Sequence, residues 1–134
     1  TVAQMALNDE DGGAGQYRGG KGIVLDYKVR NDNSFLTCAY TRTKVPPWGL
    51  KGGEVGTFNR IEVIRTDDTS ERHAMSSEVV INNDDIIRVI TANGAGYGDP
   101  KLRSREAIAN DIKNGYVTAE YASKVYNYTG EANG

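Results

Sequence analysis

The amino-acid sequence predicts an α+β fold: a β-rich body of short antiparallel strands with Gly/Pro-rich extended segments, followed by two short C-terminal helices. Three observations support this prediction. Apolar residues alternate with polar ones in short runs as far as residue 100. The 16 glycines fall mainly in three separate clusters, whereas a flexible linker would be one continuous run. Beyond Pro100 the apolar spacing changes to the period of a helix.

Short strands are expected where β-branched and aromatic residues alternate with polar ones. In the first such run, Ile23, Leu25 and Tyr27 fall on one face. Asn31–Ser34 is a turn signal, so this strand and the next are expected to form a hairpin. The five predicted strands cover residues 22–30, 35–42, 58–66, 78–82 and 86–91.

A rigid turn and two helices complete the predicted elements. Pro46 and Pro47 lack backbone donors, so the segment around them is expected to be a tight turn or polyproline II-like. Ser104 is placed to cap a helix that ends before Gly115. Thr118 is placed to cap a second helix over residues 119–126.

These elements are interpreted as one domain over residues 1–134. Residues 1–16 are polar and rich in glycine and are expected to be an extended arm. Residues 17–100 form the β-rich body, and residues 101–127 form the helical tail.

Composition and charge exclude several classes of function. The net charge is −2, which is unlike the basic footprint of a nucleic-acid-binding protein, so no nucleic-acid partner is expected. No basic cluster suits an anionic membrane, and no apolar run approaches the roughly 18 residues of a transmembrane helix. Without a signal-peptide pattern, a cytoplasmic location with no membrane partner is expected.

The sequence holds one cysteine and one histidine. An internal disulfide and a four-cysteine zinc site are therefore excluded, and no metal site is predicted. Cys38 lies in a predicted strand and is interpreted as a packing residue. His73 lies in a polar stretch and is expected in a solvated loop or strand.

Three local motifs have alternative interpretations. Gly15–Gly22 has the spacing of a phosphate-binding P-loop, but it lacks the following Ser or Thr and precedes a strand. The final two helices could form a helix-turn-helix, although the acidic chain favours packing on a sheet edge. The acidic pairs Asp67-Asp68 and Asp84-Asp85 sit at turn signals and are expected to be solvated.

Three glycine-rich segments carry a resemblance to a known family. Gly13–Gly22, Pro46–Gly56 and Gly94–Pro100 resemble, in order, three signatures of the hydantoinase B family. Together with later residues, the resemblance covers about residues 12–126 and corresponds to the C-terminal end of a longer family chain. Four residues stand where the family's final helices would place them: Asp111, Gly115, Ala122 and Tyr126.

The resemblance implies a heteromeric, ATP-dependent complex. The family includes N-methylhydantoinase, 5-oxoprolinase, acetone carboxylase and acetophenone carboxylase. These enzymes pair a hydantoinase B-type subunit with a hydantoinase A-type subunit that binds ATP. The implied partners are therefore hydantoinase A-type and hydantoinase B-type large subunits. ATP and Mg would be held by the partner subunits, with no cofactor bound by this chain.

The function expected from this resemblance is that of a small, non-catalytic subunit of an acetophenone carboxylase-like ketone carboxylase, completing the hydantoinase B-type subunit. Two alternatives stay open. The chain could be the C-terminal domain of the hydantoinase B-type component of an ATP-dependent hydantoinase or 5-oxoprolinase, or a stand-alone β-rich binding protein. No catalytic residue is assigned.

Five residues are candidates for contact with other molecules. Arg18 and Lys21 could contact a substrate or a phosphate, although Arg18 could equally pair with an acidic residue inside the fold. Tyr17, Trp48 and Tyr97 are candidate interface residues, because tyrosine and tryptophan are enriched at protein interfaces. For the two tyrosines, ordinary half-buried packing is the alternative.

Overall fold

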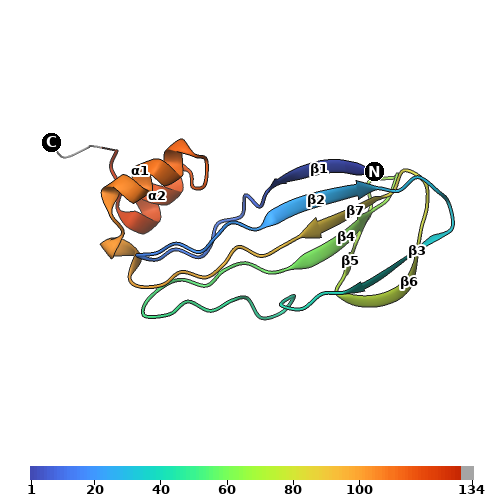
Figure 1. Ribbon diagram of the computed structural model, residues 1–134, viewed down its shortest axis with the longest axis horizontal. Helices are drawn as coiled ribbons and strands as arrows, with labels where there is room; N and C mark the ends of the chain where they lie inside the picture. Colours follow the sequence, from blue (N-terminus) through green and yellow to red (C-terminus); the bar gives the residue numbers. More distant parts are fainter. Residues whose placement is uncertain (131–134) are drawn as a thin grey trace. The chain divides into compact units, whose positions relative to one another are not determined.

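The computed structural model of the protein describes residues 1–130 (Figure 1). Its contacts group the chain into two compact units. The first, called the sheet unit here, comprises Thr1–Asn8, Gly22–Pro46 and Phe58–Ala92. The second, called the glycine unit, comprises Asp9–Lys21, Pro47–Thr57 and the residues from Asn93 onward. The predicted body, residues 17–100, is therefore divided between two units. Residues 131–134 of the predicted domain lie outside the described range.

The sheet unit contains seven strands in two antiparallel sheets, which confirms the strand-rich part of the predicted α+β fold. The larger sheet has the order β1-β2-β7-β4-β5, and β3 pairs with β6 in the smaller one. The strands are β1 Val2–Leu7, β2 Ile23–Lys28, β3 Ser34–Ala39, β4 Arg60–Ile64, β5 Ser70–His73, β6 Met75–Ile81 and β7 Ile86–Ile90.

Successive residues of a strand point to opposite faces of the large sheet, so register partners on neighbouring strands form rows that share a face. One row of register partners joins Leu25 of β2, Val89 of β7 and Ile61 of β4. The buried apolar residues of this unit are Cys38, Ile61, Val63, Ile81 and Ile90. Cys38 is thus buried and unpaired, as predicted for a packing cysteine.

The neighbouring row carries alternating charges across four strands. Asp26, Arg88, Glu62 and Arg72 are successive register partners on β2, β7, β4 and β5. Arg88 donates two hydrogen bonds, at 2.8 and 2.7 Å, to the buried carboxylate of Asp26. Opposite charges placed directly across antiparallel strands stabilise the pairing, so this charged row helps to fix the strand register.

The predicted hairpin between the first two strands is wrong. Both edges of β2 are occupied, by β1 and β7, while β3 pairs with β6. The chain after β2 is hydrogen-bonded to the turn after β6: the Val29 N–H donates to the Asp85 carbonyl at 2.9 Å, and the Asn83 N–H donates to the Asp32 carboxylate at 2.9 Å. Two adjacent connections therefore run side by side and lead into the smaller sheet.

The predicted extended arm also needs correction, because residues 2–7 form strand β1. Met5 and Leu7 are paired in register with Leu25 and Ile23. Residues 2–7 contain one polar side chain, Gln4, so the sequence shows no apolar–polar alternation there, and the strand exists through its pairing with β2. As an edge strand, β1 keeps most of its side chains exposed.

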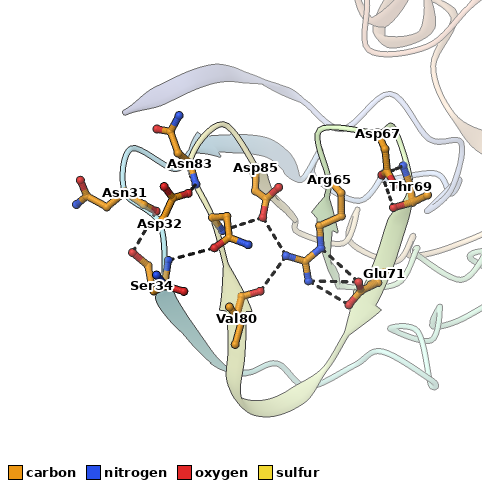
Figure 2. A network of polar contacts seen from close by, with 12 residues as sticks. Asn31, Asp32, Ser34, Arg65, Asp67, Thr69, Glu71, Val80, Asn83 and Asp85 are labelled. Atoms are coloured by element: carbon orange, nitrogen blue, oxygen red, sulfur yellow. Dashed lines mark hydrogen bonds and ion pairs between the residues drawn. The ribbon is translucent and has the colours of Figure 1, made fainter.

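Arg65 gathers several elements around the end of β4 (Figure 2). Its guanidinium donates to Glu71 of β5, to the Val80 carbonyl of β6 at 2.8 Å and to Asp85 at 2.9 Å. Burial acts to lower the pKa of Arg65, but the hydrogen bonds to Asp85 and Glu71 outweigh it, and the pKa is raised. Asp85 is buried, so the prediction of a solvated turn is wrong there, although Asp84 is exposed.

The glycine unit contains all the helices of the described chain. A short 3₁₀ turn, η1, covers Pro100–Leu102, followed by α1 Arg105–Lys113 and α2 Ala119–Tyr126. Ser104 and Thr118 cap α1 and α2 through their side chains, as predicted. Gly115 follows α1 with a φ of +70°. The core of this unit consists of Ala14, Ile108, Ala122 and Tyr126.

Candidate functional site

The three glycine-rich segments of the sequence meet in the glycine unit and bond to one another through their backbones. The Gly13 N–H donates to the Val55 carbonyl and the Glu54 N–H donates to the Ala14 carbonyl, both at 2.7 Å. The Gly96 N–H donates to the Glu54 carbonyl at 2.9 Å. Residues far apart in sequence thus form one hydrogen-bonded layer, called the glycine layer here.

Glycine is required in this layer because backbones touch where side chains would otherwise stand. A Cβ at Gly96 would overlap the Ala14 carbonyl, and a Cβ at Gly13 would overlap the Gly94 carbonyl. Gly13 also has a φ of +69°, which disfavours other residues. The clustering of glycines in the sequence is therefore explained by close packing of the backbone.

An arginine–aspartate–arginine cluster ties the glycine layer to the helices. Asp111 of α1 is buried and accepts hydrogen bonds from Arg18 at 3.2 and 3.3 Å. Arg103 donates to the same carboxylate at 2.7 and 3.1 Å. The two arginines also donate to backbone carbonyls of the first glycine segment, Arg18 to Gly19 and Arg103 to Gln16. Of the two roles considered for Arg18, internal pairing is the one that the geometry shows, and contact with a substrate stays a prediction.

The sequence did not indicate Arg103 as part of this cluster. Asp111 was noted only because it stands where the family's final helices would place it. A signal for Asp111 was present. It stands three residues after the buried Ile108, on the apolar face of α1. A carboxylate on the inner face of a helix predicts a buried, paired charge, because an unpaired one would be very costly.

Lys21 lies at the end of the first glycine segment. Its ammonium group donates to the Glu10 carbonyl at 2.9 Å. Burial lowers the pKa of Lys21, and the nearby carboxylate of Asp11 opposes that effect. Contact between Lys21 and a phosphate or substrate is untested and stays a prediction.

The three candidate interface residues are all exposed on the glycine unit. Tyr17 and Tyr97 exchange two backbone hydrogen bonds of 3.0 Å, and their ring centroids are 6.2 Å apart. Leu50 forms a parallel bridge with Tyr97, and Trp48 lies two residues before Leu50. The exposed fractions are 64% for Tyr17, 62% for Trp48, 55% for Leu50 and 43% for Tyr97. These four exposed residues, of which all but Leu50 are aromatic, are called the aromatic surface here.

A cavity of about 460 Å³ lies elsewhere in the glycine unit. The charged residues of its lining are mainly acidic. Because the lining residues come from three separate parts of the sequence, no local motif predicted this cavity. The lining residues are Asp11, Glu54, Thr118, Glu120, Tyr121, Lys124 and Val125. Among residues 1–130, no group of His, Cys, Asp and Glu side chains is arranged to hold a metal ion, and no helix is long and apolar enough to cross a bilayer.

Comparisons with known proteins agree with this architecture. The family model for hydantoinase B/oxoprolinase matches residues 1–100, which include the strands and all three glycine segments. A protein described as the B component of a D-/L-hydantoinase, from Pseudomonas sp., is 30% identical over 138 residues, covering 96% of this chain and 22% of that protein.

Two solved structures share the fold. The ATP-dependent caprolactamase of Pseudomonas jessenii has a TM-score of 0.80 at 22% identity, covering 99% of this chain and 24% of that one. A nucleotide-free acetone carboxylase has a TM-score of 0.72 at 24% identity, covering 94% of this chain and 21% of that one. The chain thus spans between a fifth and a quarter of these proteins. The glycine segments and the family match together show that this chain belongs to the hydantoinase B/oxoprolinase family.

Proposed function

We propose that this chain is a non-catalytic module that completes a hydantoinase B-type body within an ATP-dependent complex. One observation carries the proposal. Nearly the whole chain corresponds to less than a quarter of its larger relatives, and it presents four large exposed side chains on a glycine layer. A surface with exposed tyrosine and tryptophan suits a protein partner. The partner in this proposal is a hydantoinase B-type large chain.

The engagement of the two candidate cations supports a non-catalytic role. Arg18 is held by Asp111 and by the Gly19 carbonyl, and Lys21 donates to the Glu10 carbonyl. These hydrogen bonds give both cations partners within the glycine unit, as expected of residues that hold the fold together. ATP and Mg would be bound by a hydantoinase A-type subunit, and the reacting groups would lie in the larger chains.

Within the family, the proposal extends to a ketone carboxylase of the acetophenone carboxylase type, with this chain as its small subunit. That extension rests on the resemblance to the hydantoinase B family, because the family includes acetophenone carboxylase. The alternative, a B-type domain of a hydantoinase or 5-oxoprolinase, would use the same aromatic surface but a different substrate. An assay of substrates separates the two, because the first consumes bicarbonate and the second hydrolyses a ring.

Reconstitution tests the proposal. The hydantoinase A-type and B-type subunits encoded with this chain are combined with and without it. ATP consumption is then measured with acetophenone plus bicarbonate, with a hydantoin and with 5-oxoproline. The proposal predicts that ATP consumption with one of these substrates depends on the chain. Full activity in its absence, with no change in the mass of the assembly, would contradict the proposal.

A further inference from the structure

A second cavity, of about 410 Å³, lies in the sheet unit. Arg60 begins β4 and His73 ends β5, and antiparallel pairing places both at the same end of the large sheet, where Ile61 is the register partner of His73. The loop after β3 contributes Thr43 and Lys44 to the wall. The other lining residues are Phe58, Asn59, Arg72 and Ala74.

The lining of this cavity, called the basic cavity here, is positively charged. Lys44, Arg60 and Arg72 are cations, and none of its lining residues is acidic. The Glu62 carboxylate accepts contacts of 3.3 Å from the Nε atoms of both Arg60 and Arg72. One carboxylate thus holds two guanidinium groups close together and cannot neutralise both.

Glu62 is also shared with the charged row of the sheet. The pKa of Arg88 is raised chiefly by its hydrogen bonds to Asp26, and the negative charge of Glu62 adds to that effect. Because the Glu62 carboxylate serves three arginines, the basic cavity keeps an excess of positive charge. Charges held in place by neighbours bind an anion without the entropic cost of ordering long side chains.

The polar floor of the basic cavity is fixed by bonds to the backbone. The Asn59 side chain donates to the Thr41 carbonyl at 2.9 Å and accepts from the Ala92 N–H at 2.7 Å. The ring of His73 is 14% exposed, with Nδ1 3.2 Å from the Ser76 hydroxyl and Nε2 3.4 Å from the Glu71 carboxylate. This is a correction to the expectation of a solvated histidine. Glu71 itself is bonded to Arg65.

We propose that the basic cavity binds a small organic anion through a phosphate or carboxylate group. The guanidinium groups of Arg60 and Arg72 and the ammonium group of Lys44 would contact the anionic group, because a guanidinium group matches the geometry of phosphate and of carboxylate. Phe58 would provide an apolar wall for the rest of the ligand. Nothing in this proposal depends on the aromatic surface or on the large partner chain.

Calorimetric titration of the full chain, together with any partner that copurifies, tests the proposal. Inorganic phosphate and acetate are the two anionic probes, and they distinguish a phosphate site from a carboxylate site. Tetramethylammonium is the cationic control. The test variant is Arg72→Ala, because the Arg72 side chain is 75% exposed and Glu62 keeps Arg60 when it is removed. The matched control is Lys101→Ala, which removes one exposed positive charge outside the cavity.

The expected result is saturable binding of at least one anion, weakened roughly tenfold by Arg72→Ala and unchanged by Lys101→Ala. Lys44→Ala provides a second variant and should weaken binding in the same direction. The proposal is overturned if neither anion binds saturably. It is also overturned if tetramethylammonium binds as well as the anions, or if the Arg72 and Lys101 variants lose affinity equally.

Discussion

Asp111 is the carboxylate that pairs with two arginines of the glycine unit. It accepts from two arginines that are themselves largely buried, with exposed side-chain fractions of 15% for Arg18 and 11% for Arg103. Without Asp111, both guanidinium groups would be largely buried charges with no carboxylate to balance them. Because each arginine also bonds to a backbone carbonyl of the first glycine segment, the carboxylate links α1 to the glycine layer.

Replacing Asp111 with asparagine keeps the shape of the side chain and removes its charge. We expect a loss of roughly 3–5 kcal/mol in the free energy of unfolding, because two guanidinium groups are left buried without a counter-charge. Urea titration followed by circular dichroism measures this loss. Glu106→Gln removes the same charge from the exposed face of α1 and should cost less than about 1 kcal/mol. Equal losses in both variants would show that Asp111 does not have this role.

Two tyrosines of the core give the stability a defined dependence on alkaline pH. Burial raises the pKa of Tyr121 and of Tyr126 above the ordinary value of 10.0. A raised folded-state pKa means that the stabilising effect is complete below pH 10 and is lost as the pH rises through the folded-state value. Stability should therefore fall above pH 10.

In a double variant with Tyr121→Phe and Tyr126→Phe, the fall in the free energy of unfolding above pH 10 should be much smaller. The Tyr121 hydroxyl is buried without a hydrogen-bond partner among residues 1–130, so its removal should cost little at neutral pH. Urea midpoints measured from pH 8 to pH 11 compare the two proteins. The same decline in the variant and in the wild type would rule out these tyrosines as its source.

At the scale of elements, the glycine layer replaces side-chain packing with backbone contact. Gly96→Ala places a methyl group against the Ala14 carbonyl, and we expect a destabilisation of at least about 1–3 kcal/mol. Gly20→Ala is the matched control, because a Cβ there meets nothing within 4 Å. Thermal melts of both variants test the difference. If Gly96→Ala were as stable as Gly20→Ala, close backbone packing would not explain the glycine clusters.

The elements differ in how far local sequence determines them. Both helices could be predicted closely, because capping residues and apolar spacing are local signals. Strand β5, Ser-Glu-Arg-His, was missed, since it is a polar edge strand that exists through pairing with β4. The pairing of β3 with β6 was also beyond local signals, because it depends on contacts distant in sequence.

The same limit applies to the sites. The glycine clusters predicted close approach of the backbone at defined points, and the structure shows why. That three clusters form one layer could not be predicted without knowing the topology. The basic cavity combines residues from the loop after β3 with residues of β4 and β5, so no single motif indicated it. Arg72 and His73 lie in a polar stretch, where the sequence predicted a solvated loop or strand for His73.

At the scale of the whole molecule, each unit is assembled from three separate stretches of chain. Neither unit can therefore be removed as a continuous piece, which makes single substitutions the appropriate probe of each surface. The aromatic surface belongs to the glycine unit, and Phe35 on β3 offers a comparison in the sheet unit, with an exposed fraction of 66% against 62% for Trp48.

If the proposed complex forms, Trp48→Ala should weaken assembly with the hydantoinase B-type large chain by roughly 30-fold, while leaving the stability of the chain within about 1 kcal/mol. The reason is that an exposed tryptophan contributes little to its own fold and much to an interface that covers it. Phe35→Ala is expected to change neither quantity. Size exclusion measures assembly, and thermal melting measures stability. A parallel loss of assembly and stability on Trp48→Ala would place Trp48 in the core.

The mass of the native particle that contains this chain tests the central claim most directly. The chain is isolated from its natural source under gentle conditions, and the particle is sized by light scattering after size exclusion. The proposed function predicts a particle many times the 14.6 kDa of the chain, with a hydantoinase B-type large chain in it. A stable particle of the mass of one chain, with the aromatic surface left open to solvent, would contradict it.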